Sequence, residues 1–152
     1  MSDNTQLATV KATNLATPDV SMSLASTISG DSPADKARVF NATSGAVSLS
    51  AATAERDGLV LDVVDIFQTV GVRKSRNVML PNSPCVNTYL LTADGDTYMS
   101  QSDGIARSAY DLVSQAMFPD CGKSLPDGCL HLSVQAKKLD NGNTIKSLVI
   151  VG

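Results

Sequence analysis

One stretch decides the fold: residues 59–72, LVLDVVDIFQTVGV. Up to Val63 apolar and polar residues alternate about Asp62, which is the pattern of a half-buried β-strand. From Val64 onward the apolar residues continue with their phase shifted by one position. Because successive side chains of a strand point to opposite faces, this shift predicts a β-bulge. A small barrel needs such a bend so that one long strand can take part in both of its sides.

A β-hairpin is predicted downstream of this strand, over residues 86–101. An Asp-Gly dipeptide stands at its tip and favours a two-residue type I′ turn. That turn pairs Leu91 with Tyr98, and it places Tyr89 and Tyr98 on one face of the hairpin.

A helix and a second hairpin follow. Ser102 or Asp103 can cap the helix, apolar residues recur at helical spacing from Ile105 onward, and Phe118-Pro119 ends it. The second hairpin has strands at 132–137 and 144–151, with a strong turn signal at 140–143 between them.

The resulting order is three strands, a helix and two strands. We therefore predict a mainly β fold: a five-stranded OB-type antiparallel barrel with one helix between its third and fourth strands. The barrel domain is expected over residues 36–152, after a flexible arm over residues 1–35 that is rich in Ser, Thr and Ala. Residues 38–41 are read as a short strand, and residues 46–55 as one or two helical turns.

Composition restricts the class of protein. The chain has 152 residues, a formal net charge of −3, and only 4% aromatic residues. It contains no apolar run long enough to span a membrane and no signal peptide, so we expect a cytoplasmic protein with no membrane partner. The net acidity counts against a strongly basic nucleic-acid binder, although local placement of charge matters more than the sum.

Basic residues nevertheless gather at two loops that border one groove in an OB barrel. Proteins that bind single strands need cations for phosphates and flat rings on which bases stack. The candidate cations, from the loop after the first strand and from the last hairpin, are Arg73, Lys74, Arg76, Lys137, Lys138 and Lys146. The candidate rings for the floor of the groove are Phe67, Tyr89 and Tyr98. The alternatives are that the cations lie on solvated loops and that the tyrosines face the core.

No convincing catalytic site is found. The cysteines Cys85, Cys121 and Cys129 and the single histidine, His131, form a conceivable zinc set or a Cys–His pair, but no Cys-x-x-Cys motif supports it. Buried or idle thiols are the default for an odd number of cysteines. We therefore predict no metal, no cofactor and no enzymatic activity.

Two runs carry a resemblance to a known family. Residues 94–108, DGDTYMSQSDGIARS, and 138–144, KLDNGNT, resemble small single-stranded DNA-binding proteins of bacteriophages and mobile elements. The resemblance covers roughly residues 58–152. It implies an OB fold and binding without strong sequence preference, which protects single strands during replication or recombination. Many cellular relatives carry an acidic C-terminal tail, whereas this chain ends in the strand 148–152.

The leading hypothesis is therefore a single-stranded DNA-binding protein, with Arg107 paired to Asp103 or Asp111. The N-terminal arm is expected to pack against a neighbouring subunit, giving a homo-oligomer, because exposed barrel edges invite strand addition. The alternative is a structural or assembly protein, such as a virion component, that ignores nucleic acid.

Overall fold

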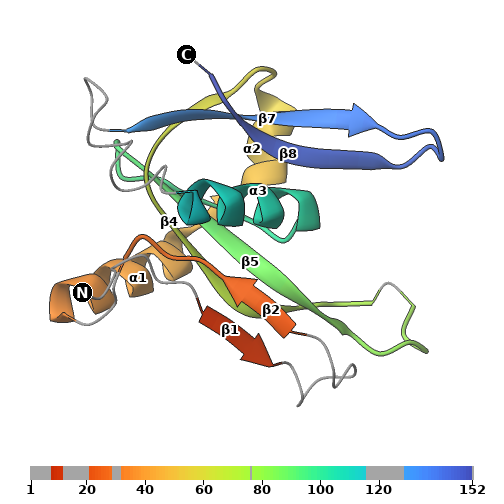
Figure 1. Ribbon diagram of the computed structural model, residues 1–152, viewed down its shortest axis with the longest axis horizontal. Coiled ribbons are helices and arrows are strands. Elements are labelled where there is room, and N and C mark those ends of the chain that lie inside the picture. The colour runs from red at the N-terminus through yellow and green to blue at the C-terminus, as the bar shows by residue number, and fades with distance from the viewer. Residues whose placement is uncertain (1–7, 12–20, 29–31, 76, 116–128, 152) are drawn as a thin grey trace.

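The protein is built on one curled six-stranded sheet (Figure 1). The structure is a computed structural model that describes residues 8–11, 21–28, 32–75, 77–115 and 129–151. In spatial order the strands are β3 (Val47–Ser48), β6 (Thr97–Ser100), β5 (Ser83–Thr92), β4 (Val60–Arg73), β7 (Leu130–Lys138) and β8 (Thr144–Ile150). A separate antiparallel pair consists of β1 (Ala8–Lys11) and β2 (Ser21–Leu24). The sheet forms a half-barrel that is broadly OB-like.

The long strand β4 holds the sheet together, as its sequence predicts. Its first residues, 60–63, pair with β7, and the rest of the strand pairs with β5. The register on β5 shifts between Val63 and Asp65, so the predicted bulge is confirmed. The bend lets one strand serve both halves of the curled sheet.

The strand count was wrong: the sheet has six strands, not five. The additional strand, β3, is only two residues long and pairs in parallel with the free edge of β6. It precedes β4 in the chain and carries no long alternating pattern, so it gave no strand signal.

The described residues form three helices, α1 (Pro33–Gly45), α2 (Leu49–Glu55) and α3 (Asp103–Ser114). The short strand expected at 38–41 is wrong, because these residues lie inside α1. The Ser32 side chain accepts a hydrogen bond from the Asp35 amide, and Pro33 occupies the first turn. A serine cap followed by proline is a strong helix start, and it outweighs the β-forming residues that come after it.

Helix α3 follows β6, precedes β7 and lies against β8 (Figure 1). Ser102 caps it by accepting from the Ile105 amide. The Ser108 hydroxyl accepts from the Leu148 amide, at 3.1 Å. Gly104 lies so close to β8 that an added Cβ atom would stand 2.0 Å from the Lys146 carbonyl oxygen. Helix α3 therefore covers the edge of β8 opposite β7.

The β5–β6 turn differs from the prediction. Leu90, not Leu91, pairs with Tyr98, and Leu91 pairs with Thr97. The Thr92 amide donates to the Asp96 carbonyl oxygen, and Gly95 has φ +95°, so the loop has three residues with glycine in the left-handed position. One extra loop residue moves the register by one, and Tyr98 therefore faces away from Tyr89.

Two apolar clusters occupy the two faces of the sheet. One lies between the sheet and α3 and includes Ile66, Leu90, Ile105 and Leu132. The other lies on the α1 side and is built from Ile28, Ala42, Phe67, Tyr89 and Leu91.

Residues before α1 contribute to this packing. The Thr27 amide donates to the Ile66 carbonyl oxygen at 2.8 Å. The Gln68 amide donates to the Ala25 carbonyl oxygen at 2.9 Å. Ala25 and Ile28 are buried. Residues 25–28 thus pack on β4, while the boundary expected at residue 35 stays a prediction. No helix among the described residues has the length and apolar character needed to cross a membrane.

Candidate nucleic-acid groove

A groove of about 670 Å³ lies where β4, β6, α3 and β8 come together. Residues 99–104, at the corner between β6 and α3, line it, together with Ser48 and Ser50. Arg73 enters from the end of β4, and residues 144–146 enter from the start of β8. We call this space the β4–β8 groove.

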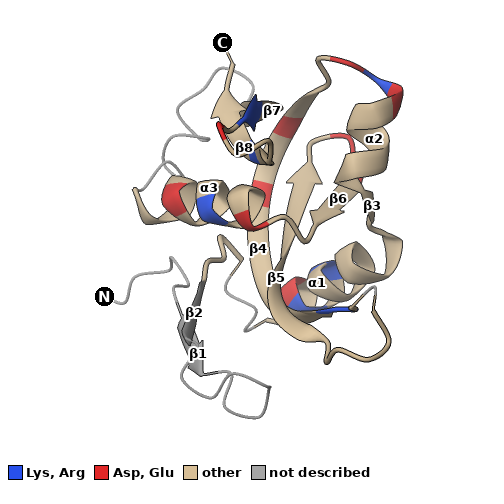
Figure 2. Cartoon of the chain, turned by 90° about the vertical axis from the view of Figure 1, so that its right-hand side faces the viewer, with Lys and Arg blue, Asp and Glu red and all other residues tan. Residues whose placement is uncertain are grey.

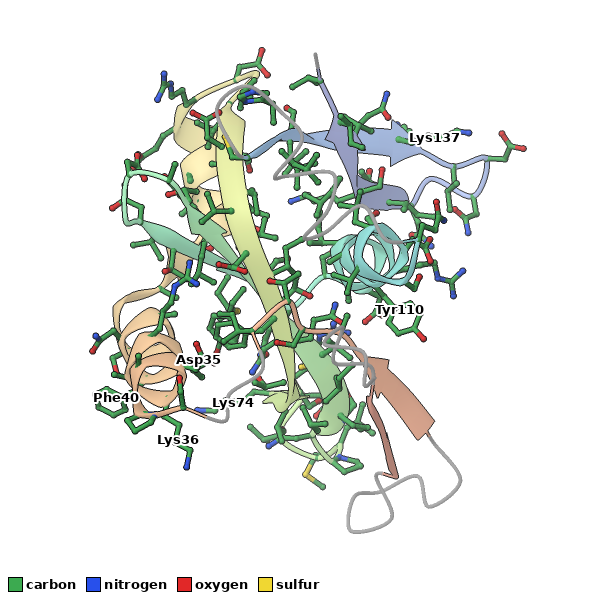
Figure 3. The ribbon with its side chains drawn as sticks, turned by 60° about the vertical axis from the view of Figure 1, so that its left-hand side comes forward. Asp35, Lys36, Phe40, Lys74, Tyr110 and Lys137 are labelled. Atoms are coloured by element: carbon green, nitrogen blue, oxygen red, sulfur yellow. The ribbon has the colours of Figure 1, made fainter. Side chains whose placement is uncertain are left out.

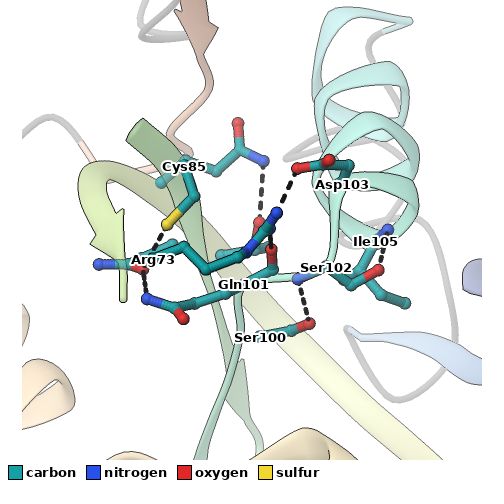
Figure 4. A network of polar contacts seen from close by, with 10 residues as sticks. Arg73, Cys85, Ser100, Gln101, Ser102, Asp103 and Ile105 are labelled. Carbon is teal, nitrogen blue, oxygen red and sulfur yellow. Dashed lines mark hydrogen bonds and ion pairs between the residues drawn. The ribbon is translucent and has the colours of Figure 1, made fainter. Parts of the chain in front are cut away.

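The corner of the groove is held by its own polar side chains (Figure 4). The Ser100 hydroxyl accepts from the Ser102 amide at 3.1 Å, and the Ser102 hydroxyl accepts from the Ile105 amide at 3.3 Å. The Gln101 side chain donates to the side-chain oxygen of Asn87 on β5, at 3.0 Å. These bonds tie the start of α3 to the sheet.

Arg73 is anchored in the groove. Its guanidinium donates to the Gln101 carbonyl oxygen and forms an ion pair with the Asp103 carboxylate at 3.3 Å (Figure 4). Its side chain is still 43% exposed, so part of the guanidinium faces solvent. Burial raises the pKa of the neighbouring Cys85 thiol, and the Arg73 charge offsets part of that rise.

The lysines of the last hairpin divide between its two faces. Lys146 lines the groove and pairs with Ala136, while Lys138 pairs with Thr144, which also lines it. Since paired residues of antiparallel strands share a face, Lys138 and Lys146 lie on the face that carries Thr144. Lys137 lies on the other face and pairs with Ile145, which lines the groove as well, so residues from both faces of the hairpin border it.

Lys74 lies outside this lining. Lys74 is exposed, and Figure 3 shows it well apart from Lys137. Arg76 lies outside the described residues. Figure 2 shows basic residues spread over several elements, including α1, α3 and β7, rather than gathered in one stripe.

Charge within the groove is nearly balanced. The lining contains the cations Arg73 and Lys146 and the carboxylate Asp103. The expected pair of Arg107 with Asp103 or Asp111 is wrong: within the described part of the chain, Asp103 pairs with Arg73 and neither carboxylate forms an ion pair with Arg107. Arg107 is exposed on α3.

The aromatic floor expected from the sequence is not part of the groove. Phe67 and Tyr89 are 4% and 8% exposed, and their rings stack on each other with centroids 4.6 Å apart. Ile28 and Ala42 of the α1-side cluster cover them. Tyr98 is half-buried against the opposite cluster, because the three-residue turn moved it to the other face.

Sequence reasoning missed the corner at residues 100–102 as a site feature. A signal was present, because Ser102 was already a predicted helix cap, and a cap next to a strand end places polar groups at a sheet corner.

The conceivable zinc set also changes. Cys85 pairs with Gly71 and His131 pairs with Asp62, and these two partners are nine residues apart on β4. Roughly 30 Å of strand therefore separates Cys85 from His131. Cys121 lies outside the described residues.

Comparison with known proteins gives one match. The model of the family described as phage single-stranded DNA-binding protein matches residues 19–150, which is most of the chain. No curated protein and no solved structure matches the chain.

Proposed function

This chain belongs to the phage single-stranded DNA-binding protein family, and on that premise we propose that the β4–β8 groove is where it holds the strand. The family consists of DNA-binding proteins rather than enzymes. We further propose that binding has no strong sequence preference and protects single strands during replication or recombination.

One observation carries the placement of the strand: Arg73 and Lys146 line the same groove although they come from opposite ends of the barrel sequence. Cations that converge along a trough track the phosphates of a single strand. The loops after the first strand and between the last two strands are also those that OB folds use for oligonucleotides. Lys137 and Lys138, which pair with Ile145 and Thr144 of the lining, are proposed to extend this path, and Lys74 and Arg76 are proposed as outer contacts.

The groove offers apolar side chains to the bases rather than exposed rings on which they could stack. Its lining holds the apolar side chains of Met99 and Ile145 but no aromatic ring. Phosphate contacts then supply most of the affinity, which favours sequence tolerance and strong salt dependence. Stacking on Phe67 or Tyr89 requires that α1 and residues 25–28 move away, and Tyr98 is proposed only as a secondary contact.

The test is a titration of fluorescently labelled oligo-dT against a matched duplex over a range of NaCl concentrations. Single strands should bind more tightly, and log affinity should fall linearly with log salt. Arg73→Ala and Lys146→Ala should each weaken binding and reduce the slope by about 1. Lys36→Ala on α1 is the matched control (Figure 3), because that exposed lysine lies outside the groove lining. Absence of oligo-dT binding at low salt would refute the proposal.

A second candidate, an assembly protein, is favoured by one surface feature. Val78 and Met79 are 95% and 85% exposed, next to exposed Leu80 in the β4–β5 loop. Consecutive exposed apolar residues favour contact with another protein. Light scattering during size exclusion separates the two candidates. An assembly that is lost in Val78→Ser/Met79→Ser, with no change when oligo-dT is added, would favour assembly. Deleting residues 1–20, which leaves the buried Ala25 and Ile28 in place, tests the proposed self-association through the arm.

A further inference from the structure

We infer that Asp62, Cys129 and His131 form a binding site for a divalent transition metal, with Zn²⁺ as the best match. One carboxylate oxygen, the thiol sulfur and one imidazole nitrogen lie within 4.8 Å of one another. The site lies outside the β4–β8 groove, so the inference is independent of the proposed function.

The β4–β7 junction brings these residues together. Asp62 and His131 are direct cross-strand partners. Cys129 precedes His131 by two positions, next to the first residue of β7. Because side chains alternate between faces, the three residues share one face, opposite to Leu61 and Leu130 of the core.

The donor set suits zinc. Thiolate, imidazole and carboxylate are its usual protein ligands, at about 2.0–2.3 Å, and tetrahedral geometry places neighbouring donor atoms roughly 3.5 Å apart. The widest spacing, up to 4.8 Å, must contract, whereas the 2.7 Å contact between His131 Nδ1 and Asp62 Oδ1 must open by roughly 0.8 Å. His131 Nδ1 already lies 2.7 Å from the Asp62 Oδ1 atom, so an ion can replace a shared proton between two groups that the sheet holds together.

Burial differs among the donors in a way that suits binding. Cys129 is 2% exposed, whereas the Asp62 side chain is 55% exposed and that of His131 is 33% exposed. The sulfur is therefore shielded, while an ion can reach the site from the carboxylate side. Three protein donors leave the fourth position for water.

Metal binding here would strengthen a short pairing. β4 and β7 pair over only four residues, Val60–Val63 with Leu130–Ser133. An ion bound on both sides of this pairing links the strand that carries Arg73 to the hairpin that carries Lys146.

The experiment is a Co²⁺ titration of the reduced full-length protein, because Co²⁺ is a spectroscopic substitute for Zn²⁺. We expect a thiolate-to-cobalt charge-transfer band that saturates at one equivalent and is removed by Zn²⁺. Cys129→Ser should abolish the band, and His131→Gln and Asp62→Asn should weaken affinity by on the order of tenfold or more. Zn²⁺ should also raise the thermal midpoint of the wild type but not that of Cys129→Ser.

Cys85→Ser, on β5 and outside the site, is the matched control and should keep the band. Circular dichroism checks that each variant folds. Asp62→Asn changes an exposed side chain, so it tests the site with the least risk to folding. No charge-transfer band in the folded wild type, or a band that persists in Cys129→Ser or is lost in Cys85→Ser, would overturn the inference.

Discussion

At the scale of single residues, Asp103 is the groove residue whose charge opposes the proposed function. It pairs with Arg73 and lies in the first turn of α3, where a carboxylate favours the helix. Its two roles therefore predict opposite consequences for binding and for stability.

Asp103→Asn should tighten oligo-dT binding roughly twofold to fivefold at low salt, because a carboxylate leaves the phosphate path. The same change should lower the free energy of unfolding by about 0.3–1 kcal/mol, because the helix loses an acidic residue in its first turn. Anisotropy titrations and urea denaturation measure the two effects. Asp111→Asn, on the same helix but outside the groove lining, is the control. Equal effects of both variants on affinity would contradict the assignment.

Gln68 connects three parts of the structure from a buried position on β4. Its side-chain oxygen accepts from the Ala25 amide at 3.0 Å, and its amide group donates to the Thr88 hydroxyl at 3.1 Å and to the Ala106 carbonyl oxygen at 2.9 Å. The residue therefore fixes residues 25–28, β5 and α3 to one strand.

Gln68→Met keeps the size of the side chain but removes all three bonds. Buried polar groups that lose their partners each cost about 1–3 kcal/mol, so we expect a loss of roughly 2–4 kcal/mol in the free energy of unfolding. Urea denaturation measures it. Gln135→Met, at an exposed position of β7, should change stability by less than about 0.5 kcal/mol. A loss at Gln68 no larger than at Gln135 would show that this network contributes little.

At the scale of elements, the β5–β6 turn decides which tyrosines share a face. Gly95→Ala places a side chain at φ +95° and should destabilise the protein by about 1 kcal/mol. Gly45→Ala, at the end of α1 with open space around its Cβ position and no positive φ, should be neutral or slightly stabilising. Thermal denaturation of both variants tests the left-handed conformation of Gly95. Equal tolerance at both positions would contradict it.

Local patterns predicted the elements that are defined by their own sequence. The bulge in β4, the Ser102 cap of α3 and the last hairpin all follow from alternation, capping and turn residues. The turn at Gly95 shows a limit of such patterns: glycine serves both a two-residue turn and the left-handed position of a three-residue turn. One residue of difference then changed the face of Tyr98.

The elements that were missed depend on contacts far apart in the sequence. The covering of Phe67 and Tyr89 requires α1 and residues 25–28, whose weak apolar patterns give no indication of where they pack. For the candidate site, charge clustering was enough to place Arg73 and Lys146 at one groove. It could not show which lysines of the last hairpin share a face, because that depends on the register between β7 and β8.

At the scale of the whole molecule, β4 joins the two proposed sites, one near each of its ends. Its end at Arg73 forms the β4–β8 groove, and its start at Asp62 forms the proposed metal site. The α1 side of the sheet, where an OB fold could present its rings, is covered. The protein should therefore bind a strand mainly through the groove and without removal of α1.

The most direct measurement is a map of backbone amide chemical-shift changes in the full-length protein as oligo-dT is added. The largest changes should fall on Arg73, on residues 100–104 and on residues 144–146, with little change around Asp62 and His131. If the largest changes instead fell on α1 and on residues 25–28, with the groove residues unaffected, the strand would bind the covered aromatic face and the placement argued here would be wrong.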